Sequence, residues 1–455
     1  MDNTAYRTAE GLLRREITLI ALIAIMIGLN VGGSLFALTS IAAGLTGPSL
    51  FIAQILSALP ILLALIPYLM LSSALPSTCA NYQYAKLFSR PMAVAAWMTL
   101  FIAIPIGALP LFAVITGNFL QMLLPSLPIM PTAIVVISIF YLLNVFGIKP
   151  TIYVQLATVV ILLIAILTFI VPGIQTIKAE NLVPLFPGGF IGFIGASALL
   201  FTLLAGGLFG IEVGSEVKNA SSVIPRALII SMFAVLAIYL LLEIVAVGVM
   251  DWQLFAEQGT LGAPAAAVLS GFPLGFFIAG GGILASVTTI NLILTIAGRY
   301  ALVFSLDGFF PKLFSRINKR FGTPHWGITL AYVMTVITLI VNPPLIVLGQ
   351  MLNFGLLFMI TLVLFSAYQF PKKYPRLYKE SHFKFNPGII RLTSLSAICI
   401  NIIFMLVLAY GLITSEDARW TFPLFVVAAI AGLVVYFIRK KQGVIPVDIS
   451  KNQEI

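Results

Sequence analysis

The chain has 455 residues, of which 60% are hydrophobic and only 9% are charged, and its mean hydropathy is +1.11. No soluble core needs so much apolar surface, so this composition excludes an ordinary soluble protein. The formal net charge of +10 at pH 7 is spread over short loops without a long basic run, which argues against a nucleic-acid partner. We therefore expect a membrane protein.

Apolar stretches recur along the whole chain, and a membrane-spanning helix needs about 20 mainly apolar residues. Continuous apolar runs, unlike alternating ones, indicate helices. The sequence thus predicts an all-α membrane protein with twelve transmembrane helices in a single transmembrane domain, 1–455. The expected helices are 17–44, 48–73, 92–123, 131–148, 151–172, 190–212, 227–250, 273–298, 327–342, 344–369, 391–413 and 420–438. The first of these helices is too long for a signal peptide, and it lacks a small-residue cleavage site.

Lysine and arginine are distributed very unevenly between the two sides of this arrangement. With twelve spans, all of them except Lys178 and Arg419 fall at the chain ends and in the loops of one side. Because basic residues are retained on the cytoplasmic side of a membrane, this split predicts a multi-pass protein of the cell membrane with both termini in the cytoplasm.

Two of the expected spans contain glycine-rich segments at mid-membrane. The first span has the sequence GLNVGGSLF at 28–36, and the sixth has AGGLFGIE at 205–212. Their placement five spans apart favours two broken helices in two inverted halves, 17–172 and 190–369, followed by two additional helices at 391–438. Close helix packing through small residues such as Gly28 and Gly32 is the alternative.

Three further segments form an ordered set of motifs. The first is Pro76 with Tyr82 and Tyr84; the second is EVKN at 216–219 with IPRA at 224–227; and the third runs from Asn291 through GRY at 298–300 and DGFFPK at 307–312 to GTP at 322–324. The second segment follows the sixth expected span, and the third begins in the eighth. With these segments in this order, the sequence resembles the amino acid-polyamine-organocation transporter family over nearly the whole chain. Ser34, Cys79-Ala80 and Ala220 depart from the family pattern.

The resemblance implies a leucine-transporter-like fold, with a 5+5 inverted repeat plus two helices, and a substrate site beside the breaks in spans 1 and 6. A helix that restarts after a break presents free N–H groups and the positive end of its dipole, which suit a carboxylate. The implied substrate-binding residues are Asn30, Val31, Gly32, Gly33, Ser34, Phe201, Gly206, Gly207 and Phe209.

The register of the break in span 6 has two possible assignments. Without a gap, the family's G-F-E falls on 206–208, whereas Gly210-Ile211-Glu212 matches better by residue type but lies four residues too close to Glu216. We prefer the gapless register because the alternative removes about one helical turn.

Acidic residues inside spans are costly and usually functional, and here they are Glu212 and Glu243. Neither falls at a position assigned to the substrate pocket. The pocket therefore lacks an anionic partner for a long cationic side chain, which favours a neutral amino acid as the small-molecule substrate. A cationic amino acid, an amine or a polyamine is the alternative, because carbonyls and aromatic faces also hold cations.

The sequence leaves open whether transport is coupled to an ion, and the candidate coupling ions are Na+ and H+. Some members of the family carry a lysine in span 5, whose ammonium takes the place of a sodium ion, but the matching position here is Leu162. By resemblance to sodium-coupled relatives of the fold, the backbone oxygens of Gly28, Val31 and Ala285 with the hydroxyls of Thr288 and Thr289 form a candidate cation site, since hard cations take oxygen ligands. The alternative is that both hydroxyls bond carbonyls of their own helix.

The remaining functional classes lack support in the sequence. A channel should show polar rings along a pore-lining helix, and an enzyme needs a catalytic or metal-ligand cluster; the only histidines are His325 and His382. We therefore predict a secondary active transporter, by symport or antiport, that is not an enzyme. No cofactor beyond the coupling ion, no other metal and no obligate protein partner is indicated.

Overall fold

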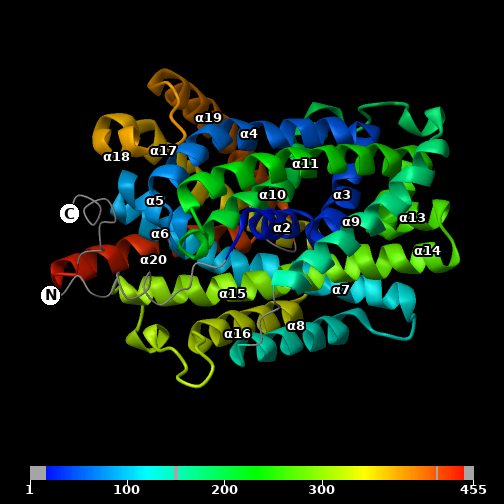
Figure 1. Cartoon of the computed structure of the whole chain (residues 1–455). Helices are drawn as coiled ribbons and strands as arrows, with labels where there is room; N and C mark the ends of the chain where they lie inside the picture. Colours follow the sequence, from blue (N-terminus) through cyan, green and yellow to red (C-terminus); the bar gives the residue numbers. More distant parts are fainter. Residues whose placement is uncertain (1–16, 148–151, 417–418, 445–455) are drawn as a thin grey trace.

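A computed structural model describes residues 17–147, 152–416 and 419–444. Helices make up nearly all of this part of the chain, and they run roughly side by side in one bundle (Figure 1). Nine apolar stretches of the described residues are long enough to cross a membrane, and two apolar helices, α8 (Ile129–Val145) and α16 (His325–Val341), are shorter. The all-α membrane class is confirmed, whereas the count of twelve spans stays a prediction. The basic residues Arg7, Arg14, Arg15, Lys149 and Lys451 lie outside the described residues.

The helices follow the expected apolar stretches closely and mostly extend a few residues beyond them. Their bounds in the first half are α2 Leu19–Asn30, α3 Gly33–Thr46, α4 Leu50–Ala74, α5 Ala80–Phe88, α6 Arg90–Ala103, α7 Leu109–Leu123, α8 Ile129–Val145 and α9 Ile152–Gln175. The second half comprises α10 Gly189–Ala205, α11 Ala220–Val249, α12 Trp252–Gln258, α13 Gly262–Val268, α14 Gly271–Phe276, α15 Leu284–Leu306, α16 His325–Val341 and α17 Leu345–Lys373. The chain continues through α18 Pro375–Glu380, α19 Pro387–Thr414 and α20 Thr421–Lys441.

The two glycine-rich spans depart from regular α-helix in different ways. The first is interrupted between α2 and α3, where Val31 and Gly32 have non-helical backbone angles. The sixth does not open; instead α10 tightens at Gly206 into a 3-10 segment, η4, that runs to Glu212. Both irregular segments lie inside the bundle and contact each other, so two buried backbone distortions meet at one place.

Two other spans contain π-helical turns. One is η2, Ile104–Ala108, between α6 and α7, and the other is η6, Phe277–Ile283, between α14 and α15. Pro105 and the glycines of η6 account for these insertions, because proline removes a helix donor and glycine weakens the helix. Wide turns of this kind are frequent at functional sites.

Short helices mark the two ends of the bundle. Helices α5 and α18 lie at the left end in Figure 1, whereas α13 and α14 lie at the right end. Helix α5 packs against α17 and α6 and contacts η4. Helix α5 therefore lies at the left end of the bundle and contacts the end of the sixth span.

Candidate functional site

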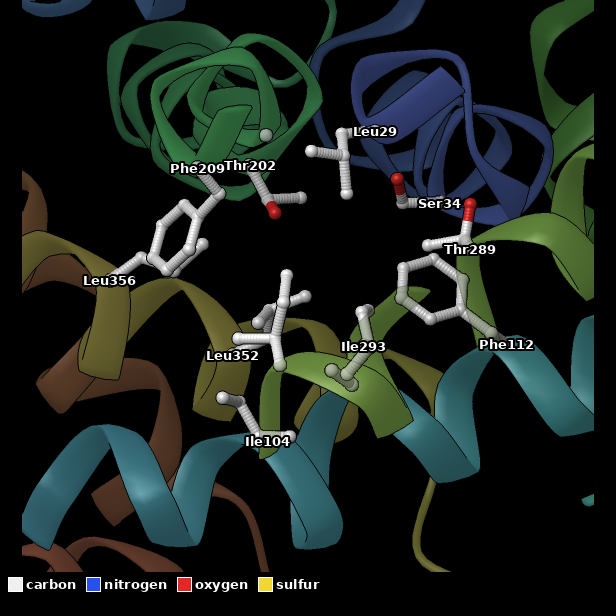
Figure 2. A pocket seen from close by; sticks show the side chains of 13 residues that line it. Leu29, Ser34, Ile104, Phe112, Thr202, Phe209, Thr289, Ile293, Leu352 and Leu356 are labelled. Carbon is white, nitrogen blue, oxygen red and sulfur yellow. The ribbon is translucent and has the colours of Figure 1, made fainter. Parts of the chain in front are cut away.

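A cavity of about 60 Å³ lies between the irregular parts of the first and sixth spans and the third, eighth and tenth spans (Figure 2). Its lining consists of Leu29, Ser34, Ile104, Ala108, Phe112, Thr202, Gly206, Phe209, Thr289, Ile293, Ile296, Leu352 and Leu356. A single water molecule needs about 10–15 Å³ of such a cavity. The cavity therefore has space for a few non-hydrogen atoms, about as many as an aliphatic side chain contains.

The restart of the first span supplies polar groups to one side of this cavity. In a continuous helix the Gly32 N–H would pair with the Gly28 carbonyl, but here it donates to the Asn30 carbonyl at 2.8 Å. Gly33 and Ser34 then begin α3, and the first N–H groups of a helix have no intrahelical acceptor; the next one, the Leu35 N–H, donates to the Gly32 carbonyl at 3.1 Å. These donors and the α3 dipole favour an anionic group beside Ser34.

Asn30 joins the two irregular segments. Its side-chain oxygen accepts a hydrogen bond from the Gly207 N–H at 2.5 Å, and the Asn30 side chain is fully buried. A Cβ atom on Gly206 would overlap the Leu29 carbonyl oxygen, and one on Gly207 would lie 2.6 Å from the Asn30 amide nitrogen. Glycine at both positions is therefore required for the close approach of the two spans.

The opposite side of the cavity is an apolar wall. Figure 2 shows Ile104 from the third span, Ile293 from the eighth and Leu352 from the tenth facing Leu29, Ser34 and Thr202 across the cavity. Within the part of the chain that the structure describes, the only polar side chains in the lining are the hydroxyls of Ser34, Thr202 and Thr289. The lining therefore holds an aliphatic group well and offers no charge to a cationic one.

Of the nine residues expected to bind substrate, only some line the cavity. Ser34, Gly206 and Phe209 line the cavity, whereas Asn30, Val31, Gly32, Gly33 and Gly207 form the adjoining breaks without lining it. Phe201 lies elsewhere: its buried ring packs edge-on against Phe404 of α19, with ring centroids 6.4 Å apart. Of the two phenylalanines expected at the substrate site, only Phe209 lines the cavity.

Sequence reasoning missed the apolar wall, and it also missed Leu29 and Thr202. A run of Ile and Leu does not say which face of a buried helix meets a cavity, because every face of such a helix is apolar. One signal was present in the third span: Pro105 and Gly107 at mid-membrane coincide with the π-helical turn that carries Ile104 and Ala108 into the lining.

The residues of the candidate cation site lie close to the break, but their hydroxyls have helix partners. The Thr288 hydroxyl donates to the carbonyls of Leu284 and Ala285 at 2.9 and 3.0 Å, and the Thr289 hydroxyl donates to Ala285 at 2.8 Å. This is the pairing of ordinary membrane threonines. Thr289 is near the first span, because a Cβ on Gly32 would overlap its hydroxyl. Cation binding here stays a prediction.

A cluster of buried polar residues lies where the end of the sixth span meets α5. One Glu212 carboxylate oxygen accepts hydrogen bonds from the Asn81 N–H, the Asn81 side-chain amide and the Tyr300 hydroxyl, at 3.2, 2.6 and 2.8 Å. The Tyr68 hydroxyl donates to Asn81 at 2.6 Å, and the Cys79 N–H donates to the Glu212 carbonyl at 3.2 Å. We call Tyr68, Asn81, Glu212 and Tyr300 the Glu212 cluster.

Two ion pairs lie at the same end of the bundle. Lys86 contacts Asp307 at 3.0 Å, where the Tyr82 hydroxyl also donates at 2.8 Å, and Arg299 contacts Glu216 at 2.9 Å. Apart from Lys86, these residues belong to the three sequence motifs, and Tyr82 and Asp307 are 225 residues apart in the chain. Tyr82, Glu216, Arg299 and Asp307 therefore form contacts at the α5 end of the bundle and do not line the cavity.

Comparison with known proteins gives a consistent family. Residues 17–436 match the family described as amino acid permease. The chain is 26% identical to the branched-chain amino acid permease of Bacillus subtilis over 97% of this chain and 96% of that protein, and 25% identical to the methylthioribose transporter of the same organism over 97% of both. It is 25% identical to the chloroplastic cationic amino acid transporter 9 of Arabidopsis thaliana over 70% of this chain and 60% of that protein. The match over nearly the whole chain confirms the resemblance seen in the motifs, and the chain belongs to the amino acid permease family of membrane transporters.

Proposed function

We propose that this protein is a secondary active transporter of neutral amino acids with aliphatic side chains, in the cell membrane, with both termini in the cytoplasm. The observation that carries the proposal is the cavity itself: a restarted helix on one side and a wall of isoleucine and leucine side chains on the other. The free N–H groups of Gly33 and Ser34 bind the substrate carboxylate, and the apolar wall takes its side chain.

The ammonium group of the substrate needs acceptors near the same break. The carbonyl of Gly28 loses its helical partner when the Gly32 N–H donates to Asn30. An α-ammonium beside such carbonyls is held without an acidic residue. The α-carboxylate and α-ammonium are thus bound by backbone atoms, which every amino acid substrate can use alike.

Transport follows by alternating access between two inverted halves, 17–172 and 190–369. The Glu212 cluster and the two ion pairs join the helices at the α5 end of the bundle. The distribution of lysine and arginine supports a cytoplasmic location for this end. Opening on that side requires these contacts to separate. The cavity beside the two breaks stays at mid-membrane while access to it alternates.

A cationic amino acid or an amine is the competing substrate class, and the names of the plant relatives point to it. The lining residues argue against it, because none of them is acidic. A buried ammonium at the end of a long side chain without a carboxylate or hydrogen-bond partners is costly. Methylthioribose, named in a bacterial relative, is uncharged and belongs in the same test.

The test is a thermal-shift screen of the purified protein. A ligand that binds only the folded state raises its apparent stability by RT ln(1 + [L]/Kd). We expect valine, leucine and isoleucine to raise the melting temperature, and lysine, arginine, putrescine and methylthioribose to leave it unchanged.

Transport of the same compounds, measured as counterflow in liposomes, checks that binding leads to transport. Stabilisation and counterflow by lysine or putrescine without any response to leucine would contradict the proposed substrate class.

A further inference from the structure

Glu243 is a buried acid that the substrate site and the Glu212 cluster leave unused. It lies in α11, six residues before the end of that helix, with an exposed fraction of 0%. Neither of its carboxylate oxygens has a hydrogen-bond partner among the described residues, whereas Glu212 has three donors on one oxygen. An acid in this state requires an explanation, because buried polar groups are normally paired.

Among the described residues, the elements packed against α11 carry no cationic side chain that would stabilise ionised Glu243. Helix α11 packs against α2, α4, α9, α10, α13 and the short segments η1, η3, η4 and η5, and no lysine, arginine or histidine occurs in any of them. Their titratable residues are Tyr68, Tyr153, Glu180, Glu212 and Glu216. Lys178, whose backbone N–H donates to the Gly248 carbonyl, has an exposed side chain. On α11 itself the facing titratable group is Tyr239, one turn earlier.

An ionised carboxylate without a partner is not stable in such an environment, because burying an unpaired charge is far more costly than burying a neutral acid. The neutral form is the one that fits the structure. We propose that Glu243 is the proton-binding site of this transporter: it holds a proton in the conformation described here and releases it when the opening of the protein admits water to α11. The proposal rests on the proposed transport function and assigns its coupling ion.

Tyr239 links this acid to the cavity. Its hydroxyl donates to the Leu203 carbonyl of α10 at 3.2 Å, next to Thr202 in the cavity lining and three residues before η4 begins. Residues four apart on a helix share one face. When Glu243 loses its proton, its carboxylate becomes the better acceptor and takes the Tyr239 hydroxyl from Leu203. The proton therefore favours the arrangement of α10 seen here, and substrate and proton strengthen each other's binding.

The sign of the pH effect follows from this linkage. Substrate binds the arrangement that holds the proton, so its affinity falls as pH rises and the site empties. In Glu243→Gln the neutral amide replaces the protonated acid, so affinity stays at its low-pH value at every pH. This variant exchanges labelled substrate across the membrane but does not accumulate substrate when only a pH gradient is imposed.

The experiment uses purified wild type, Glu243→Gln and the control Glu257→Gln, which changes an exposed acid of α12. Three readouts are taken: the infrared band of an un-ionised carboxylic acid at neutral pH, the pH dependence of leucine affinity, and leucine accumulation in liposomes under a pH gradient. We expect the band to weaken, the pH dependence to vanish and the accumulation to be lost in Glu243→Gln alone. Glu243→Leu, which suits an apolar site, replaces the glutamine variant if that variant does not fold.

Each readout has an outcome that overturns the proposal, and for leucine affinity that outcome is an unchanged pH dependence in Glu243→Gln. An infrared band of wild-type intensity in Glu243→Gln means that Glu243 is ionised, and accumulation at the wild-type level means that the proton binds elsewhere. The infrared readout needs no substrate. Failure of the proposed function is separate: the wild type would then bind none of the aliphatic amino acids, while the band would still depend on Glu243.

Discussion

On the side of the first and sixth spans the cavity is bordered by irregular backbone. On the side of the third, eighth and tenth spans it is bordered by side chains of regular or π-helical turns, all of them apolar except Thr289. The backbone side depends on glycines that no other residue replaces without overlap. The fit on the other side depends on the volume of the lining side chains, which a substitution can change in small steps. We infer that the first side binds what all amino acids share and that the second selects among their side chains.

The largest expected effect comes from filling the backbone side. A Cβ atom on Gly33 would overlap the Ser286 hydroxyl and lie 3.1 Å from the Phe112 ring. Gly33→Val should therefore displace the start of α3 and remove two hydrogen bonds to the substrate carboxylate. At about 1.5–3 kcal/mol for each bond to a charged group, uptake should fall about 100-fold or more.

Gly275→Val is the matched control, because a Cβ at Gly275 of α14 meets nothing within 4 Å. Initial rates of leucine uptake, together with melting temperatures of the purified variants, provide the comparison. Uptake by Gly33→Val at normal affinity would place the carboxylate elsewhere.

A smaller effect is expected from the apolar wall. Ile293→Ala enlarges the cavity and should leave the carboxylate contacts in place, so the preference among substrates changes more than the maximal rate. Because a single methylene in an apolar pocket is worth about tenfold or more in discrimination, the preference for valine over phenylalanine should fall about tenfold in competition assays.

The control for this variant is Ile340→Ala on α16, whose side chain is 71% exposed on the outside of the described bundle. Equal loss of uptake for all amino acids in Ile293→Ala would mean that the wall stabilises the fold and does not select the substrate.

The smallest effect concerns sodium at the border of the two sides. Because the hydroxyls of Thr288 and Thr289 already donate to carbonyls of α15, we expect leucine affinity to differ by less than about fivefold between sodium and choline at equal ionic strength, below the usual range of coupling. A stronger sodium effect that disappears in the Thr288→Val, Thr289→Val double variant would instead establish the oxygen cage with Gly28, Val31 and Ala285.

The sequence by itself determined the membrane class, the position of nearly every helix and the two glycine-rich segments, because apolar runs and mid-span glycines are local signals. It also indicated the family, since the motifs keep their order and spacing. The break at Gly32 and the change of helix type at Gly206 both fall inside the predicted segments.

Only the tertiary structure decided which side chains meet. Phe201 packs against Phe404, whereas Phe209 lines the cavity. The motif residues Tyr82, Glu216 and Asp307 form contacts at the α5 end of the bundle and not in the cavity lining. Glu212 has hydrogen-bond donors, whereas Glu243 has none among the described residues. In an apolar helix buried on all sides, periodicity does not mark a functional face. The orientation of each helix is fixed by packing against its neighbours, and that information is not local in the chain.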